Sequence, residues 1–576
     1  MAGYIARRLL LTIPTLVLVA LAVFALIRMV PGDPAQLMLG DSADAETLEA
    51  LRKAMGHDRS LAAQFLHWSG RVLAGDLGLS ITSREPVLPL ILTRFAVTAQ
   101  IVVVAVVLSS LIAVPLGMIA AWRQNSGVDL GITAFSTLMV SLPSFWLGLI
   151  LLLVFGVWLQ WLPIVGYVGL AEDPLRSLSF VVLPVLTLVL IEVGVLTRMA
   201  RAATIDVLGL EYVAHARAKG VSEAGVMVRH VLPNAFAPTL TLIGVVLGNL
   251  LGGIAVIETV FTLPGLGRLM VDAIFQRDYP VVQGVMLFIA TTYLSPVRSP
   301  RGGGGVMRAR LNLIIGGTLV TALVAMAATA LVWTPASPVR VNIRARLQPP
   351  SGQYWLGTDE FGRDVLSRLM TGAQTSLTVA VTTVVVAMAI GIAVGVTSGF
   401  FRGWIDRVLM MANDALLAFP GILLALGLLA VIGPSQWGIV MALGLAYAPT
   451  VARVVRGQVL SLREREFVEA SRALGNSQAY TLVRHVLPHT VSPLIVLATS
   501  MCGWVILAES ALSFLGLGVP PPAPTWGNML SAARPFMETA PQLAIVPGVM
   551  IALCLLGANL LGDALRDLLD PRMLGR

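Results

Sequence analysis

The residues whose types suggest chemistry gather in two stretches that repeat each other. Arg229–Pro233 has the letters RHVLP, which return unchanged at Arg484–Pro488. Further matches at the same displacement pair Arg198 with Arg453, Arg201 with Arg456, Glu211 with Glu466, Arg217 with Arg472, Ala218 with Ala473, Gly220 with Gly475, and Pro238 with Pro493. Because all these matches have the same displacement, the two halves of the chain are predicted to be homologous. The histidines and charges of such a unit could bind a metal or belong to a functional loop.

Neither repeat has the spacing of a metal site or of a nucleotide-binding loop. His230 and His485 belong to separate repeats, and His57 and His67 lack cysteine or close histidine neighbours. No Gly-x-x-x-x-Gly-Lys-Ser/Thr phosphate loop occurs, since neither of the lysines has the glycines that it needs. We therefore predict no catalytic residue, no metal site and no cofactor bound by this chain.

The elements that position these residues lie in a membrane. Hydrophobic residues make up 57% of the chain and charged residues 12%, which does not fit a soluble protein of 576 residues. A spanning helix needs about 20 apolar residues. Apolar runs fall near 9–30, 97–121, 131–158, 180–197, 239–261 and 281–294, and again near 311–333, 374–398, 408–432, 436–452, 491–513 and 543–562. We expect an all-α membrane protein with about six spans in each half.

The net charge of +8 reflects membrane topology in this interpretation, and not a nucleic-acid partner. The arginines lie in short loops between apolar runs, and those of both repeats fall on the same side as Arg7 and Arg8 if every run crosses. Because positive loops stay inside, both termini are predicted to be cytoplasmic. The segments 33–94 and 520–541 would then face outwards. The domain prediction is a first half at 1–294, a cytoplasmic Gly/Arg linker at 295–310 and a second half at 311–576.

Each repeat loop is predicted to be a helix, a glycine stop and a second helix. Residues 211–219 form a plausible amphipathic helix, and Gly220 can take the left-handed conformation after its end. Ser222 would cap the second helix, which Pro233 and Pro238 would bound. The alternative is a surface hairpin that only covers the helix bundle. We favour a functional loop, because a loop that only covers the bundle has no reason to keep the same pattern in both halves.

The second repeat resembles the cytoplasmic EAA-type loop of ABC importer permeases. The resemblance rests on Glu469-Ala470-Ser471, Gly475, His485 and Leu487-Pro488, whereas the first repeat has Ala214-His215-Ala216 in place of the acidic start. It implies that each loop docks on an ATPase subunit, so that ATP is used by partner subunits. The coupling residues it implies are Glu211, Ala214, Arg217, Gly220, His230 and Pro233 in the first repeat, and Glu466, Glu469, Arg472, Gly475, His485 and Pro488 in the second.

Four further stretches resemble the dipeptide, oligopeptide and nickel permeases of that family. Residues 4–34 and Gly75–Gly78 look like its first permease type, and Leu356–Asp364 and Ser513–Gly518 look like its second. The resemblance implies two permeases fused in one chain of the bacterial inner membrane. It also implies two cytoplasmic ATPase subunits, an extracytoplasmic solute-binding protein and surrounding lipid as partners. The expected function is peptide import.

Acidic residues within spans are costly, and we treat them as candidates for the translocation path. Glu258 and Glu509 precede a Gly-Leu-Gly by the same interval, so they are equivalent positions near the outer end of the fifth span. Either their carboxylates bind the ammonium group of a peptide, or they are structural carboxylates. Glu192 is a single candidate within a span, and Asp414 is interpreted as a satisfied structural carboxylate.

Other functions stay open at this point. A nickel or other small-solute importer would have the same architecture. A secondary transporter driven by an ion gradient can also have parallel repeats. The sixth run of the first half has only about 14 apolar residues, which is about 21 Å of helix, and Pro296 opposes its extension. That feature alone favours a non-transporting remnant of a gene fusion.

Overall fold

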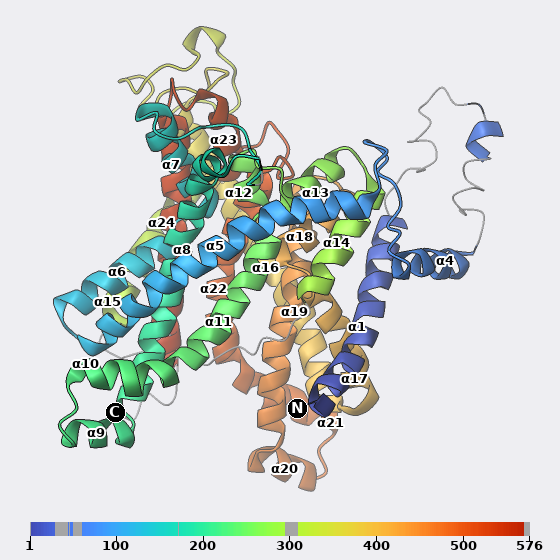
Figure 1. Cartoon of the computed structure of the whole chain (residues 1–576), viewed down its shortest axis with the longest axis vertical. Helices are drawn as coiled ribbons and strands as arrows, with labels where there is room; N and C mark the ends of the chain where they lie inside the picture. Colours follow the sequence, from blue (N-terminus) through green and yellow to red (C-terminus); the bar gives the residue numbers. More distant parts are fainter. Residues whose placement is uncertain are drawn as a thin grey trace. The chain divides into compact units, whose positions relative to one another are not determined.

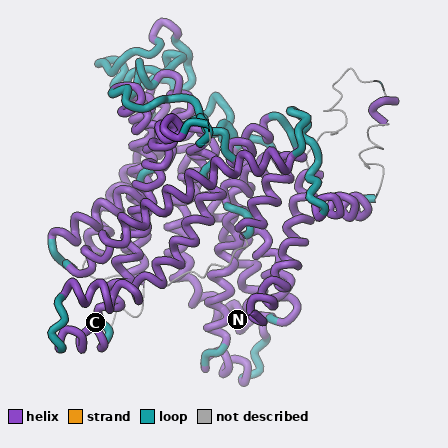
Figure 2. The backbone as a smooth tube through the Cα atoms, viewed as in Figure 1, coloured by secondary structure: helices purple, strands orange, loops and turns teal. Residues whose placement is uncertain are grey.

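The computed structural model describes residues 2–28, 44, 46–49, 60–170, 172–293 and 309–569. This part of the chain is built of helices joined by loops, as Figure 2 shows, and its extended pairings are two isolated bridges. The all-α prediction is confirmed.

The helices of the first half are α1 (Ala2–Arg28), α4 (Leu61–Leu73), α5 (Val87–Trp122), α6 (Gly127–Ser141), α7 (Ser144–Leu151), η1 (Leu152–Trp158), α8 (Pro174–Leu208), α9 (Glu211–Ala218), α10 (Glu223–Val226), η2 (Met227–Val231), α11 (Leu232–Gly253), α12 (Ala255–Val260), α13 (Leu266–Phe275) and α14 (Tyr279–Tyr293). Those of the second half are α15 (Ala309–Val332), η4 (Ile343–Ala345), α16 (Val365–Phe401), α17 (Gly403–Leu417), α18 (Gly421–Ile432), α19 (Gln436–Arg463), α20 (Glu466–Ala473), α21 (Gln478–Thr481), η5 (Leu482–Val486), α22 (Leu487–Phe514), α23 (Trp526–Ala533), η6 (Arg534–Phe536) and α24 (Gln542–Leu569).

Within the described residues, 8 helices are long and apolar enough to cross a membrane, and two bent pairs raise the number to 10. The bent pairs cover the apolar runs at 131–158 and 408–432, and each run consists of two helices with a bend between them. Helix α6 meets the α7–η1 segment at 97°, and α17 meets α18 at 93°. Pro143 and Pro420 stand at the N-caps of α7 and α18. Proline restricts the residue before it and removes a backbone donor, so each apolar run breaks there.

The residues group into two compact units, and neither unit is one half of the sequence. Unit 1 consists of Met1–Thr98, Pro264–Ser295 and Val385–Pro488, and unit 2 of Ala99–Leu263, Pro296–Val384 and His489–Arg576. In unit 1, α1 of the first half packs against α17 and α18 of the second (Figure 1). In unit 2, α24 of the second half packs against α6 and α7 of the first. Each unit therefore combines helices from both halves.

The predicted boundaries at 294 and 311 follow the order of the sequence and stay predictions. Residues 295–308 of the predicted linker lie outside the described residues. The short sixth span of the first half is α14, with 15 residues, whereas α24 in the second half has 28. At about 1.5 Å per residue, α14 is about 22 Å long and α24 about 42 Å.

Small residues let the fourth span of the second half pack closely in unit 1. Gly391, Gly395 and Gly399 follow one another at intervals of one turn along α16 and face α19. A Cβ at Gly391 would lie 2.4 Å from Val451 Cβ, and one at Gly395 would lie 2.5 Å from the Ala452 carbonyl oxygen. Such a stripe brings two backbones together in a membrane, where packing has to replace the hydrophobic effect. It fixes the helix that carries the second repeat loop.

Candidate functional site

The two repeats form loops with the same backbone. The first repeat loop is 209–231, between α8 and α11, and the second is 464–486, between α19 and α22 (Figure 1). Gly220 has φ 77° and Gly475 has φ 81°, so both glycines end their first helix in the left-handed conformation. The side chains of Ser222 and Ser477 accept hydrogen bonds from the backbone N–H groups of Gly225 and Tyr480. The predicted glycine stop and serine cap of the first loop are confirmed.

The predicted bounds of the second helix at Pro233 and Pro238 are wrong, because both prolines lie within the continuous helix. Helices α10, η2 and α11 run without a break from Glu223 to Gly253. The chain widens to a π-turn at η2, where the Leu232 N–H donates to the Met227 carbonyl oxygen, and Pro233 follows within the first residues of α11. The missing N–H of proline is tolerated at that position. The second loop does the same at η5 and Pro488, so each loop continues directly into its fifth span.

A buried core joins the first repeat loop to the end of the fourth span. Val213, Val226 and Val231 are fully buried, together with Ala203 and Val207 of α8. Their burial ties α9, α10 and η2 to α8, because apolar surface removed from water stabilises the arrangement.

In the second repeat loop, a polar pair takes the place of two apolar residues of this core. Val468 and Val486 are buried, whereas Ser471 and Thr481 occupy the places of Ala216 and Val226. The two hydroxyls share a hydrogen bond of 3.0 Å, and the Asn476 side chain donates to Ser471 at 3.2 Å. Each loop is therefore one block attached to its fourth span.

The outer surface of both loops presents large apolar side chains that sequence reasoning missed. Tyr212 and Phe467 stand at equivalent places, with exposed fractions of 38% and 37%. Val228 and Val483 are also equivalent, and 60% and 62% of each is exposed. The signal for them was in the sequence, since an aromatic residue follows Glu211 and Glu466 in both repeats. Large apolar side chains are therefore exposed at matching positions of the two loops.

The predicted acidic and glycine positions of the loops are exposed. Glu211 and Ala214 of α9 are exposed, as are Glu466 and Glu469 of α20. The prolines of the repeats, Pro233 and Pro488, are exposed too.

The equivalent arginines of the loops have different partners. Arg217 makes a two-pronged ion pair with Glu223, at 2.9 and 3.3 Å. The place of Glu223 is taken by Gln478 in the second loop, and Arg472 lies over the ring of Phe400 at 5.6 Å.

The histidines are half-buried parts of the loop fold. The backbone carbonyl of His230 accepts from the Tyr212 hydroxyl at 3.3 Å and from the Asn234 side chain at 2.9 Å. The ring of His485 lies 5.8 Å from that of Tyr480. Across the described residues no group of three or more metal-binding side chains occurs. The absence of a metal site in the protein stays a prediction.

Paired arginine–aspartate bonds anchor the fourth spans close to both loops. In unit 2, Arg201 of α8 donates through Nε and Nη2 to both carboxylate oxygens of Asp129, at 2.6 and 2.8 Å. In unit 1, Arg456 of α19 does the same with Asp406, at 2.6 and 2.7 Å. Two-pronged pairs fix direction as well as distance. The side chain of Asp129 is fully buried, so this anchor is shielded from salt.

The acidic residues of the predicted translocation path are placed differently. Glu509 on α22 is fully buried and accepts hydrogen bonds from Ser376 at 3.2 Å and Ser513 at 2.7 Å. Glu258 on α12 is also fully buried, while Glu192 is half-buried on α8. The hydroxyl shell of Glu509 favours the structural alternative for that carboxylate. The path roles stay predictions.

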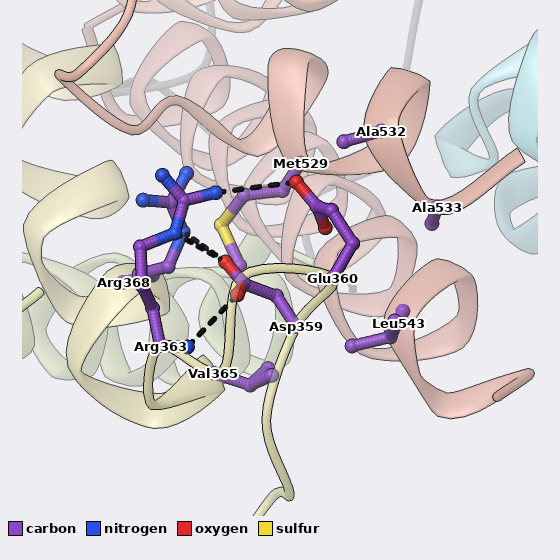
Figure 3. Close-up of a pocket in the computed structure, with 9 residues that line it drawn as sticks. All are labelled: Asp359, Glu360, Arg363, Val365, Arg368, Met529, Ala532, Ala533 and Leu543. Atoms are coloured by element: carbon purple, nitrogen blue, oxygen red, sulfur yellow. Dashed lines mark hydrogen bonds and ion pairs between the residues drawn. The ribbon is translucent and has the colours of Figure 1, made fainter. Parts of the chain in front are cut away.

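A second polar cluster precedes α16 in unit 2, in the stretch that carried the resemblance to the second permease type. Asp359 accepts from Arg363 Nε at 2.7 Å and lies 3.3 Å from Arg368 Nε, and Glu360 binds Arg363 at 3.2 Å. Figure 3 shows these groups beside Met529, Ala532, Ala533 and Leu543. Burial raises the pKa of the Glu360 carboxyl above its usual value. The cluster ties the loop before α16 to itself and leaves little room for a ligand.

The conserved pattern of the binding-protein-dependent transport system inner membrane component matches this chain twice, at residues 113–297 and 391–575. Both matches contain a repeat loop. The chain belongs to this family. The N-terminal pattern of binding-protein-dependent transport system membrane components also matches, at residues 1–102.

Named relatives each match about half of the chain. A putative peptide transport system permease protein of Brucella suis is 39% identical over 295 residues, which are 51% of this chain and 94% of the relative. The dipeptide transport system permease protein DppC of Alkalihalophilus pseudofirmus is 42% identical over 260 residues, 45% of this chain and 86% of its own length. The glutathione transport system permease protein GsiC of Escherichia coli is 41% identical over 294 residues, 51% of this chain and 94% of its own length.

The family and the apolar helices together give the general function. The chain is a multi-pass inner-membrane permease of an ABC importer, with two permease domains in one polypeptide. A permease of this family works with ATPase subunits and a solute-binding protein.

Proposed function

We propose that this chain imports di- or oligopeptides, and that each repeat loop docks on one of two cytoplasmic ATPase subunits. The observation that carries the proposal is the common backbone of the loops, with left-handed Gly220 and Gly475 and exposed Tyr212 and Phe467 at matching positions. Two copies of one surface are what two related partners require. The names of the relatives from Brucella suis and Alkalihalophilus pseudofirmus support peptides as the substrate class.

The proposed topology has both termini and both repeat loops in the cytoplasm. Its support is the distribution of arginines, which concentrate in the loops and in α8 and α19 next to them. A reporter fused at Gly303 is expected to report cytoplasm, and a reporter fused after α4 at Gly75 is expected to report the outside. Gly303 outside would exclude the arrangement of two complete halves.

The proposed mechanism transmits force without chemistry in this chain. ATP is hydrolysed by the partner subunits, and no cofactor is held here. When an ATPase moves its docked loop, the buried core of that loop carries the movement to the fourth span. The loop also continues without a break into its fifth span. One docking surface can therefore shift two spans together.

Uptake into vesicles separates this function from its alternatives. The full transporter, with ATPase subunits and binding protein, is expected to accumulate a labelled dipeptide only with ATP inside. Uptake without ATP that follows a proton gradient would instead indicate a secondary transporter. Competition by nickel, with no competition by peptides, would favour the small-solute alternative. No uptake of either class with ATP would favour the remnant.

A further inference from the structure

Each fourth span carries one more paired arginine, one turn before the two-pronged anchor. In unit 2, Arg198 Nη2 lies 3.1 Å from Asp563 Oδ2, and in unit 1, Arg453 Nη2 lies 2.8 Å from Asp414 Oδ1. The arginines are equivalent in the repeat, and all four side chains are about half exposed. Their carboxylates are not equivalent, because Asp563 belongs to the sixth span α24 and Asp414 to α17.

The sequence of the first half accounts for the difference. Gly284-Val285-Met286 aligns with Gly548-Val549-Met550, and this register puts Ser299 at the place of Asp563. Serine offers no carboxylate at that place of the sequence. By the register of Pro143 with Pro420, Asp414 corresponds to Thr137, so the first half has no carboxylate at the place of Asp414 either.

We propose that Asp414 is a positioning residue that replaces the carboxylate missing from the sixth span of the first half. Both fourth spans then keep an ion pair close to their repeat loop, although the sequence of one sixth span has Ser299 at the place of the carboxylate. The inference rests on the proposed function, since the loops are taken to be the sites where the ATPases act.

A continuous helix connects each ion pair to its repeat loop. From Arg198 to the end of α8 at Leu208, and from Arg453 to the end of α19 at Arg463, the helix is unbroken for about 15 Å. A half-exposed pair contributes little to the stability of the whole fold. It can still hold the direction of a stiff helix, and with it the direction of the attached loop.

The packing of the two units agrees with this substitution. In unit 2 the sixth span α24 packs against α6 and α7, whereas in unit 1 it is the first span α1 that packs against α17 and α18. The third-span helix of unit 1 thus has a different neighbour, and it carries its own acidic residue toward α19.

The test compares Asp414→Asn and Asp563→Asn in the reconstituted full transporter. Asp272→Asn is the control, because Asp272 of α13 is about as exposed as Asp414 but lies 3.7 Å from its arginine, Arg268, and outside both repeat loops. Both aspartate variants are expected to keep normal abundance and ATPase binding, and to lose up to about fivefold of the peptide imported per ATP hydrolysed. The control is expected to match the wild type. The exchanged pair Asp414→Arg with Arg453→Asp is expected to recover the coupling ratio.

Three results would overturn the inference. These are a wild-type coupling ratio for Asp414→Asn, no recovery in the exchanged pair, and an equal loss in the Asp272→Asn control. Absence of ATP-driven uptake by the wild-type chain would overturn the proposed function and, with it, this inference.

Discussion

Ser471 and Thr481 share a 3.0 Å hydrogen bond at the two positions where the first repeat loop buries Ala216 and Val226. The same backbone is thus held by a polar pair in one copy and by an apolar pair in the other. Either pair satisfies the interior, because it leaves no buried hydroxyl without a partner. A pair of one hydroxyl and one apolar side chain would leave that hydroxyl buried without a partner.

We expect Ser471→Ala to weaken the second repeat loop. The change leaves the buried Thr481 hydroxyl without its partner, which costs about 1–3 kcal/mol. Adding Thr481→Val should recover most of the loss, because the double variant copies the pair of the first loop. Limited proteolysis within 464–486 reports the effect. Equal sensitivity of the single and double variants would show that the pair is not coupled.

Gly475→Val is expected to uncouple the ATPase without disturbing the membrane bundle. No atom lies within 4 Å of an added Cβ at Gly220 or Gly475, so a side chain meets only backbone strain. That strain is about 1–2 kcal/mol in the left-handed region. Normal membrane abundance, weaker ATPase pull-down and lower uptake are the expected results. We expect a larger loss than for Gly220→Val, because the second loop has Glu469 where the first has Ala214.

Gly475→Asn is the matched control for strain, since asparagine tolerates the left-handed conformation better than valine. It should retain more ATPase binding than Gly475→Val. Normal pull-down and uptake by the Gly220→Val, Gly475→Val double variant would show that the loops only cover the bundle.

The exposed aromatic residues should contribute to docking and not to folding. Tyr212→Ala and Phe467→Ala remove partly exposed rings, so the thermal unfolding of the permease alone should change little. Aromatic residues at the centre of an interface commonly contribute more than 1 kcal/mol to binding, so each variant should lower ATPase affinity about fivefold or more. Leu331→Ala, on the exposed surface of α15, serves as the control. Unchanged affinity in both aromatic variants would exclude this contact.

The sequence predicted the loops well because their determinants are local. Gly220 and Ser222 act within a few residues, and the structure places both as expected. The bends at Pro143 and Pro420 were missed, because the run of apolar residues continues across each proline. The run gives the length of an apolar segment and not its direction. The packing of α1 against α17 could not be predicted either, since it joins surfaces distant in sequence that are equally apolar everywhere. Pairs such as Arg453–Asp414 depend on that packing.

Gly395→Val should be the most damaging single change in the membrane part of unit 1. A Cβ there lies 2.5 Å from the Ala452 carbonyl oxygen and 2.7 Å from Val455 Cβ, so α16 and α19 would have to separate. Overpacking of this kind costs about 1–3 kcal/mol and can cost more against backbone. We expect lower abundance and a lower temperature of thermal unfolding. Gly457→Val on α19, where nothing lies within 4 Å, should fold normally.

Glu509→Gln distinguishes a structural carboxylate from one that meets the substrate. Glutamine keeps the shape. Its oxygen can accept from one of Ser376 and Ser513, and its amide N–H can donate to the other hydroxyl, so the fold should survive with a modest loss of stability. Glu509→Leu removes every acceptor and should lower abundance, because both hydroxyls are then buried without that partner. In uptake assays, Glu509→Gln should affect a free dipeptide and its N-acetylated form equally, since the hydroxyl shell already occupies the carboxylate. A selective loss for the free ammonium form would instead place Glu509 on the translocation path.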